Sequence, residues 1–186
     1  MKKYELTSET KVFLGKTLYR IKALVQFGNV NAGDLGGWIE KEENLSQSGN
    51  AWVYGNAWVY GNAEVSGDAR VSDDAEVYGN ARVSGDARVY GDAEVYGNAR
   101  VYGNAEVCKI GAVFWIGAIG SRNRTTTFFR CKDGKIYVSC GCFLGDLEEF
   151  SDKVKQTHGD NEHGRVYMLA IEMAKARIVE EKNEVH

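Results

Sequence analysis

The stretch that decides the fold runs from residue 51 to residue 107 and reads AWVYGN-AWVYGN-AEVSGD-ARVSDD-AEVYGN-ARVSGD-ARVYGD-AEVYGN-ARVYGN-AEV. Its unit is Ala, a variable residue, Val, Tyr or Ser, Gly, and Asn or Asp, and only Asp73 replaces the glycine. Side chains alternate along a strand, so Ala and Val share one face. Gly with Asn or Asp then provides a corner, because these residues tolerate unusual backbone angles. The pattern predicts one side of a polygonal coil every six residues.

This repeat resembles the hexapeptide-repeat proteins, which fold as left-handed parallel β-helices and place a small residue four positions after an aliphatic one. The resemblance implies three hexapeptides per coil, so that residues 18 apart stack, and it also implies the handedness. We expect a mainly β chain with an N-terminal β cap over residues 1–48, a parallel β-helix over residues 49–120, and a C-terminal ββαα cap over residues 121–186. Val113 and Ile119 keep the Val phase downstream, and Ile39 and Leu45 fall on the Ala phase upstream.

Stacking by 18 residues predicts three outward faces. The first carries Trp52, Arg70, Arg88 and Glu106, with Tyr54, Ser72, Tyr90 and Cys108 beside them. Stacked tyrosines favour strand structure, but aromatic faces are also typical of binding or subunit interfaces. Like charges that stack within one chain would suit contact between an acidic face of one subunit and a basic face of the next. The candidate binding residues lie on the second and third faces: Trp58, Tyr60, Tyr78, Tyr96, Glu76, Glu94, Arg82 and Arg100.

The flanking segments predict a hairpin at each end. In the N-terminal part, strands around 11–14 and 17–24 turn at Gly15. In the C-terminal part, strands over 125–131 and 135–142 turn at Asp133-Gly134, a strong hairpin signal. Asp146 followed by Glu149 predicts a capping box at a helix start, and Gly159 predicts its end. A second helix is expected from about residue 162 to residue 180.

Composition excludes several classes of partner and setting. The chain has 186 residues, a formal net charge of −3 and 44% hydrophobic residues, so a strongly basic nucleic-acid binder or a polybasic membrane-surface protein is disfavoured. The N-terminal sequence lacks an apolar signal region, and no apolar run is long enough to span a membrane. We expect reduced cysteine thiols and a cytoplasmic protein.

Catalytic and metal-binding residues are sparse. Hexapeptide-repeat acyltransferases typically use a histidine base beside the coils, but the histidines here are His158, His163 and His186, all outside the repeat. His158 is the candidate base if the chain is an acyltransferase. Cys140 and Cys142 would share a strand face and, with His158 and His163, are the candidate zinc ligands. Buried thiols and surface histidines explain the same residues, so we expect no metal and no cofactor.

The whole layout also resembles small hexapeptide-repeat proteins of phages and prophages. The shared segments are Lys3–Leu6, Gly33–Ile39 and Cys140–Phe143. The leading interpretation is a non-catalytic binding or scaffold protein of phage or prophage origin. It would inhibit or sequester a host-defence protein through the β-helix faces or the C-terminal cap. The alternatives are an acyltransferase with an atypical base and an oligomer that sequesters a small anionic ligand, with Tyr78, Tyr96 and arginines in an intersubunit pocket. The hexapeptide-repeat resemblance implies a homotrimer.

Overall fold

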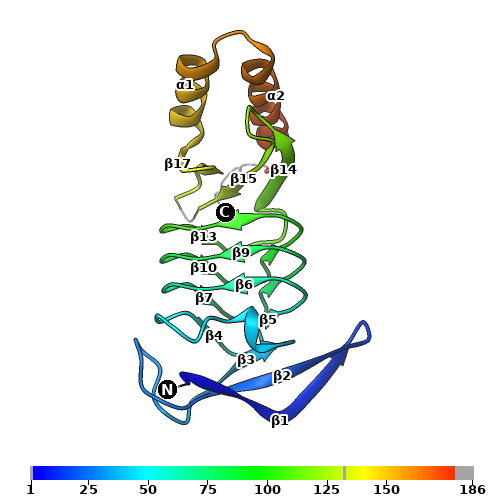
Figure 1. Ribbon diagram of the computed structural model, residues 1–186, viewed down its shortest axis with the longest axis vertical. Helices are drawn as coiled ribbons and strands as arrows, with labels where there is room; N and C mark the ends of the chain where they lie inside the picture. Colours follow the sequence, from blue (N-terminus) through cyan, green and yellow to red (C-terminus); the bar gives the residue numbers. More distant parts are fainter. Residues whose placement is uncertain (1, 132, 179–186) are drawn as a thin grey trace, which may run out of the picture.

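The computed structural model describes residues 2–131 and 133–178. Figure 1 shows a stack of coils in the middle of the molecule, a long hairpin at one end and two helices at the other. The coils form a parallel β-helix with three strands per coil, as the repeat and its resemblance predict. Both flanking segments therefore close the ends of a stack that would otherwise expose unpaired strand edges.

Three parallel ladders make the sides of the coil. The first ladder consists of β4 (Trp52–Val53), β7 (Arg70–Val71), β10 (Arg88–Val89) and β13 (Glu106–Val107). The second ladder contains β5 (Trp58–Val59), β8 (Glu76–Val77) and β11 (Glu94–Val95). The third ladder contains β6 (Glu64–Val65), β9 (Arg82–Val83) and β12 (Arg100–Val101).

The register of these ladders confirms the stacking by 18 residues. Val53 lies opposite Val71, and Val71 lies opposite Val89. All valines and alanines of the repeat from Ala51 to Val107 are at most 2% exposed, so they fill the inside of the coil. Burial of each valine contributes about 1.5 kcal/mol before the entropy of ordering the chain is counted.

Corner glycines let the coils approach closely. Gly67 has a φ of +68°, and a Cβ placed on it would lie 2.9 Å from the backbone nitrogen of Gly85 in the next coil. Only glycine avoids both the left-handed strain and this contact. The glycine of the repeat therefore sets the spacing between coils as well as the turn.

The first coil corrects the expected phase of Ile39 and Leu45. Ile39 lies opposite Val59, and Leu45 forms a bridge to Val65, so these pairs are 20 residues apart rather than 18. Both side chains are buried at valine positions instead of alanine positions. The two additional residues lie between Leu45 and Val53, where the chain passes from the first coil into the regular repeat.

The N-terminal cap is an antiparallel extension of the second ladder. β1 (Tyr4–Phe13) pairs with β2 (Lys16–Ala23), β2 pairs with β3 (Leu35–Ile39), and β3 pairs in parallel with β5. The turn at Leu14-Gly15 confirms the predicted hairpin, although β1 begins earlier than expected. A short 3-10 helix (Glu42–Asn44) follows β3.

The β-helix does not extend to residue 120 as expected. The parallel ladders end at Val107, and Val113 and Ile119 lie in β14 (Val113–Ile119), which pairs antiparallel with β15 (Arg124–Arg130). β16 (Ile136–Cys140) and β17 (Phe143–Asp146) complete this sheet. The C-terminal cap is therefore four strands followed by two helices rather than ββαα. The Thr127 hydroxyl accepts the Arg100 N–H at 2.9 Å, so β15 covers the last coil.

Two helices pack on the C-terminal sheet around Phe128 and Phe150. α1 (Leu147–His158) starts at the predicted capping box, with Asp146 as N-cap, and Gly159 follows its last residue. α2 (Glu162–Arg177) is capped by Asn161. Its expected last residues, 179 and 180, lie outside the described residues. Neither helix is long and apolar enough, over the residues that the structure describes, to cross a membrane.

Candidate functional site

The predicted aromatic column exists on the second face of the β-helix. The rings of Tyr60 and Tyr78 are stacked with centroids 5.1 Å apart, and those of Tyr78 and Tyr96 are stacked at 5.5 Å. We call these three residues the tyrosine ladder. Phe114, the next aromatic residue of the expected column, lies in β14 and packs against Phe128, so the ladder ends at Tyr96.

Hydroxyl groups of the ladder are bonded within the chain. Tyr60 donates to Glu76 Oε2 at 3.0 Å, and Tyr78 donates to Glu94 Oε2 at 3.1 Å. Burial and the glutamate partner raise the pKa of Tyr60, and the same causes raise the pKa of Tyr78 to about 12. The two glutamates therefore bind the tyrosines of their own chain, and these hydrogen bonds contribute to the stability of this face.

The N-terminal hairpin covers the lower part of the ladder. Phe13 lies edge-on to Trp58 with ring centroids 4.8 Å apart, and it also contacts Tyr60. Tyr60 is only 7% exposed, whereas Tyr96 is 37% exposed. Of the predicted aromatic residues, Tyr96 is thus the most accessible to a partner.

Arg82 and Arg100 lie on the third face, one above the other. Arg82 forms an ion pair with Glu64 at 3.3 Å. The structure therefore divides the eight predicted binding residues between two faces of the coil. Any single partner that contacts both the ladder and these arginines has to reach around a corner or lie between subunits.

Cysteines and histidines of the candidate metal site are not brought together. Cys140 ends β16 and its sulfur lies 3.6 Å from the Tyr167 hydroxyl, while Cys142 is exposed in the turn before β17. Because Gly141 has a φ of +64°, the two cysteines do not share a strand face as expected. The rings of His158 and His163 lie 5.7 Å apart. Within residues 2–131 and 133–178, no group of three or more His, Cys, Asp or Glu residues is placed to hold a metal ion.

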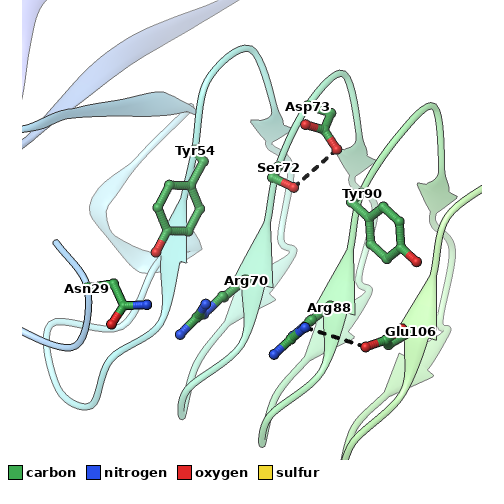
Figure 2. Close-up of a pocket in the computed structure, with 8 residues that line it drawn as sticks. All are labelled: Asn29, Tyr54, Arg70, Ser72, Asp73, Arg88, Tyr90 and Glu106. Carbon is green, nitrogen blue, oxygen red and sulfur yellow. Dashed lines mark hydrogen bonds and ion pairs between the residues drawn. The ribbon is translucent and has the colours of Figure 1, made fainter.

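A groove on the first face was missed as a site by the sequence interpretation. It has a volume of about 450 Å³. Figure 2 shows Arg70 and Arg88 side by side, with the rings of Tyr54 and Tyr90 on either side of Ser72. We call it the arginine groove, and its lining comes from successive coils and the N-terminal cap: Asn29, Tyr54, Arg70, Ser72, Asp73, Arg88, Tyr90 and Glu106.

The groove exists because Ser72 and Asp73 stand where the neighbouring coils of this face carry tyrosine and glycine. Tyr54 and Tyr90 occupy the equivalent position in the coils before and after Ser72, so the small serine leaves a gap in the column. Asp73 takes the glycine position with a φ of +60°. Its carboxylate accepts the Gly91 N–H at 3.0 Å and the Ser72 hydroxyl at 3.4 Å.

The two arginines of the groove differ in whether a carboxylate pairs with them. Arg88 forms an ion pair with Glu106 at 3.5 Å. Among the described residues, no carboxylate lies within ion-pair distance of Arg70, which stands directly opposite Arg88 in the ladder. Burial, together with the neighbouring Cys108 and Glu106, raises the pKa of Tyr90. The groove therefore combines two arginines with the carboxylates of Asp73 and Glu106, and Arg70 is the arginine of the groove that no described carboxylate pairs with.

The sequence contained a signal for this groove. Asp73 is the one replacement of the repeat glycine, and Arg70 and Arg88 were placed on one face by the 18-residue stacking. The prediction favoured the second face for its aromatic column and the third face for its arginines. The gap in the neighbouring column, rather than the complete column, is what creates space.

Comparison with known proteins supports the class of the central fold. The YdcK β-solenoid repeat family matches residues 75–91, 81–95 and 93–108. These windows lie within the coils, so the central part of the chain is a hexapeptide-repeat β-solenoid. The uncharacterized acetyltransferase YdcK of Escherichia coli (strain K12) is 39% identical over 62 residues, which cover 29% of this chain. The match covers 19% of that relative's own length.

Proposed function

We propose that the protein is a binding module that holds an anionic ligand in the arginine groove. The observation that carries this proposal is Arg70, a half-buried guanidinium in a hollow of about 450 Å³ with no carboxylate partner among the described residues. An arginine presents a planar set of donors that suits carboxylate or phosphate oxygens. A bound anion would satisfy donors that the chain leaves free.

Charge stacking strengthens this proposal. Arg70 and Arg88 lie opposite each other on adjacent strands, and like charges in such pairs repel. An anion between or beside the two guanidinium groups would relieve that repulsion. The backbone hydrogen bonds between coils also fix the backbone of the groove before the ligand arrives, so binding requires little ordering of the backbone.

This proposal is a specific form of the non-catalytic binding protein that the sequence predicts. The arginine groove supports ligand binding more directly than the tyrosine ladder does. Tyr60 is covered by Phe13, and the Tyr60 and Tyr78 hydroxyls are already bonded to glutamates. Tyr96 and its surroundings remain a candidate surface for a protein partner. A host-defence partner and a phage origin stay predictions that rest on the resemblance. A cytoplasmic location stays a prediction from the cysteine content and the N-terminal sequence.

An NMR titration with inorganic phosphate tests the proposed function. The wild-type chain should show saturable shifts at residues of the groove, and Arg70→Gln should weaken phosphate binding at least about tenfold because it removes the unpaired cation. Arg82→Gln is the matched control, since it changes the same repeat position on the third face and should leave binding within about twofold. Phosphate shifts that are absent, or that persist unchanged in Arg70→Gln, would overturn the proposal.

Acetyl transfer is the second candidate, favoured by the name of the relative from Escherichia coli. The candidate base, His158, ends α1 and lies close to His163 and Tyr167, on the C-terminal cap. This is the opposite end of the stack from the N-terminal hairpin (Figure 1). Release of coenzyme A from acetyl-coenzyme A in the presence of amine or sugar acceptors, lost in His158→Ala, would support this candidate.

A further inference from the structure

One ring is missing from the aromatic column of the first face. Tyr54, Ser72 and Tyr90 occupy equivalent positions, because each donates its N–H to a valine carbonyl of the next coil: Val71, Val89 and Val107. Adjacent strands of a sheet are about 4.8 Å apart, so Tyr54 and Tyr90 are separated by ~9.6 Å, which is two strand spacings. Ser72 leaves the middle of this interval open.

The tyrosine ladder on the second face shows that an aromatic ring fits between two tyrosines separated by two strand spacings. There the middle ring, Tyr78, stacks with Tyr60 at 5.1 Å and with Tyr96 at 5.5 Å. Three rings therefore fit on three successive coils of this β-helix. Tyr54, Ser72 and Tyr90 also lie on three successive coils, but the middle position carries no ring.

A ring in that interval would lie beside the two arginines. Figure 2 shows Ser72 and Asp73 between Tyr54 and Tyr90, with Arg70 and Arg88 on the neighbouring part of the strands. The hydroxyl of Ser72 and the amide of Asn29 also line the groove and can bond polar substituents. The surroundings thus combine two tyrosine rings and the unpaired Arg70 with the carboxylates of Asp73 and Glu106.

From this geometry we infer that the interval over Ser72 is a slot for one planar aromatic ring whose anionic substituent pairs with Arg70. The inference deepens the proposed function and rests on it, because it names the class of anion that the groove takes. Stacking of a planar ring on aromatic side chains strengthens binding by about tenfold or more. The preferred ligand is therefore a small aromatic phosphate or carboxylate rather than an inorganic or aliphatic anion.

Four probe ligands distinguish the contribution of the aromatic ring to affinity from the contribution of the negative charge. Binding of phenyl phosphate, cyclohexyl phosphate, benzoate and inorganic phosphate is measured with the full chain by NMR titration. Phenyl phosphate should bind at least about tenfold tighter than cyclohexyl phosphate, which has the same charge and a ring that cannot stack. Benzoate then distinguishes a carboxylate ligand from a phosphate ligand. Equal affinity for the planar and the saturated phosphate would overturn the inference.

Filling the slot provides the decisive variant. Ser72→Tyr restores the missing ring, so it should weaken phenyl phosphate binding at least about tenfold and leave inorganic phosphate within about twofold. Ser84→Tyr is the matched control, because Ser84 is the equivalent repeat position on the third face. Tyr54→Leu is the second variant, for use if Ser72→Tyr does not fold. It removes one of the two tyrosine rings, so it should also weaken phenyl phosphate binding and leave inorganic phosphate binding within about twofold.

The outcomes separate the inference from the proposed function. Phosphate binding that Arg70→Gln abolishes, together with no effect of Ser72→Tyr and Tyr54→Leu on phenyl phosphate, would overturn the slot and keep the anion site. Loss of all anion binding in the wild-type chain would overturn both.

Discussion

Asp73 shows how one residue changes a regular coil. A non-glycine residue in the left-handed region costs about 1 to 2 kcal/mol, and here the carboxylate bonds to Gly91 and Ser72 offset part of this cost. The corner is also more open, because a Cβ on Gly55 would lie 4.0 Å from the Asp73 carbonyl oxygen, against 2.9 Å at Gly67. The repeat made this break visible in the sequence. The hollow beside it depends on side chains of other coils, which no local pattern reports.

Lys3 is the residue for which we predict a pH effect. Its ammonium group donates to the Ala51 carbonyl oxygen at 2.9 Å, the residue is only 4% exposed, and burial lowers the pKa of Lys3 from 10.5 to about 8. Between these two values the unfolded chain binds a proton that the folded chain has released. The free energy of unfolding contributed by Lys3 should therefore rise with pH from about 8 to 10.5.

Urea unfolding at several pH values across this window measures that effect. The wild-type chain should gain stability with pH relative to Lys3→Met, whose side chain carries no proton to release. Lys2→Met is the control, because Lys2 is exposed and pairs with Glu42. Parallel pH dependences of the wild-type chain and Lys3→Met would contradict the prediction.

At the scale of elements, the cap of α1 carries a testable contribution. The Asp146 carboxylate accepts the N–H groups of Glu148 at 3.1 Å and Glu149 at 2.9 Å. Asp146→Ala should lower the free energy of unfolding by about 1 kcal/mol, because two helix N–H groups lose their partner. Asp152→Ala removes an exposed ion pair with Lys155 and should change stability by less than about 0.5 kcal/mol. Equal losses in denaturant unfolding would argue against the cap.

Elements with local signals were predictable, and elements that depend on distant partners were not. The two-residue strands follow from the valine and glycine spacing, and the start of α1 follows from Asp146 and Glu149. Val113 keeps the phase of the repeat, yet β14 leaves the coil because it pairs antiparallel with β15. Similarly, the turn at Gly141 divides β16 from β17, a division set by pairing within the C-terminal sheet.

For the whole molecule, we predict a homotrimer. The prediction rests on the resemblance to hexapeptide-repeat proteins and on the acidic residues of the second face, Glu76 and Glu94, which would meet the arginines of a neighbouring third face. Native mass spectrometry and sedimentation at micromolar concentration should show three chains. The double charge reversal Arg82→Glu with Arg100→Glu should reduce this assembly, and Arg70→Gln should not. A monomeric wild-type chain under these conditions would refute the trimer.

The stacking of residues 18 apart also limits how this chain can change in length. Removing one complete coil shortens the stack but returns every later residue to its own side. Removing a single hexapeptide between Arg70 and Arg88 would rotate everything after it by one side of the coil. Arg88 would then leave the column of Arg70, and the C-terminal helices would turn relative to the N-terminal hairpin. Insertions and deletions within the repeat should therefore be compatible with the groove only in whole coils.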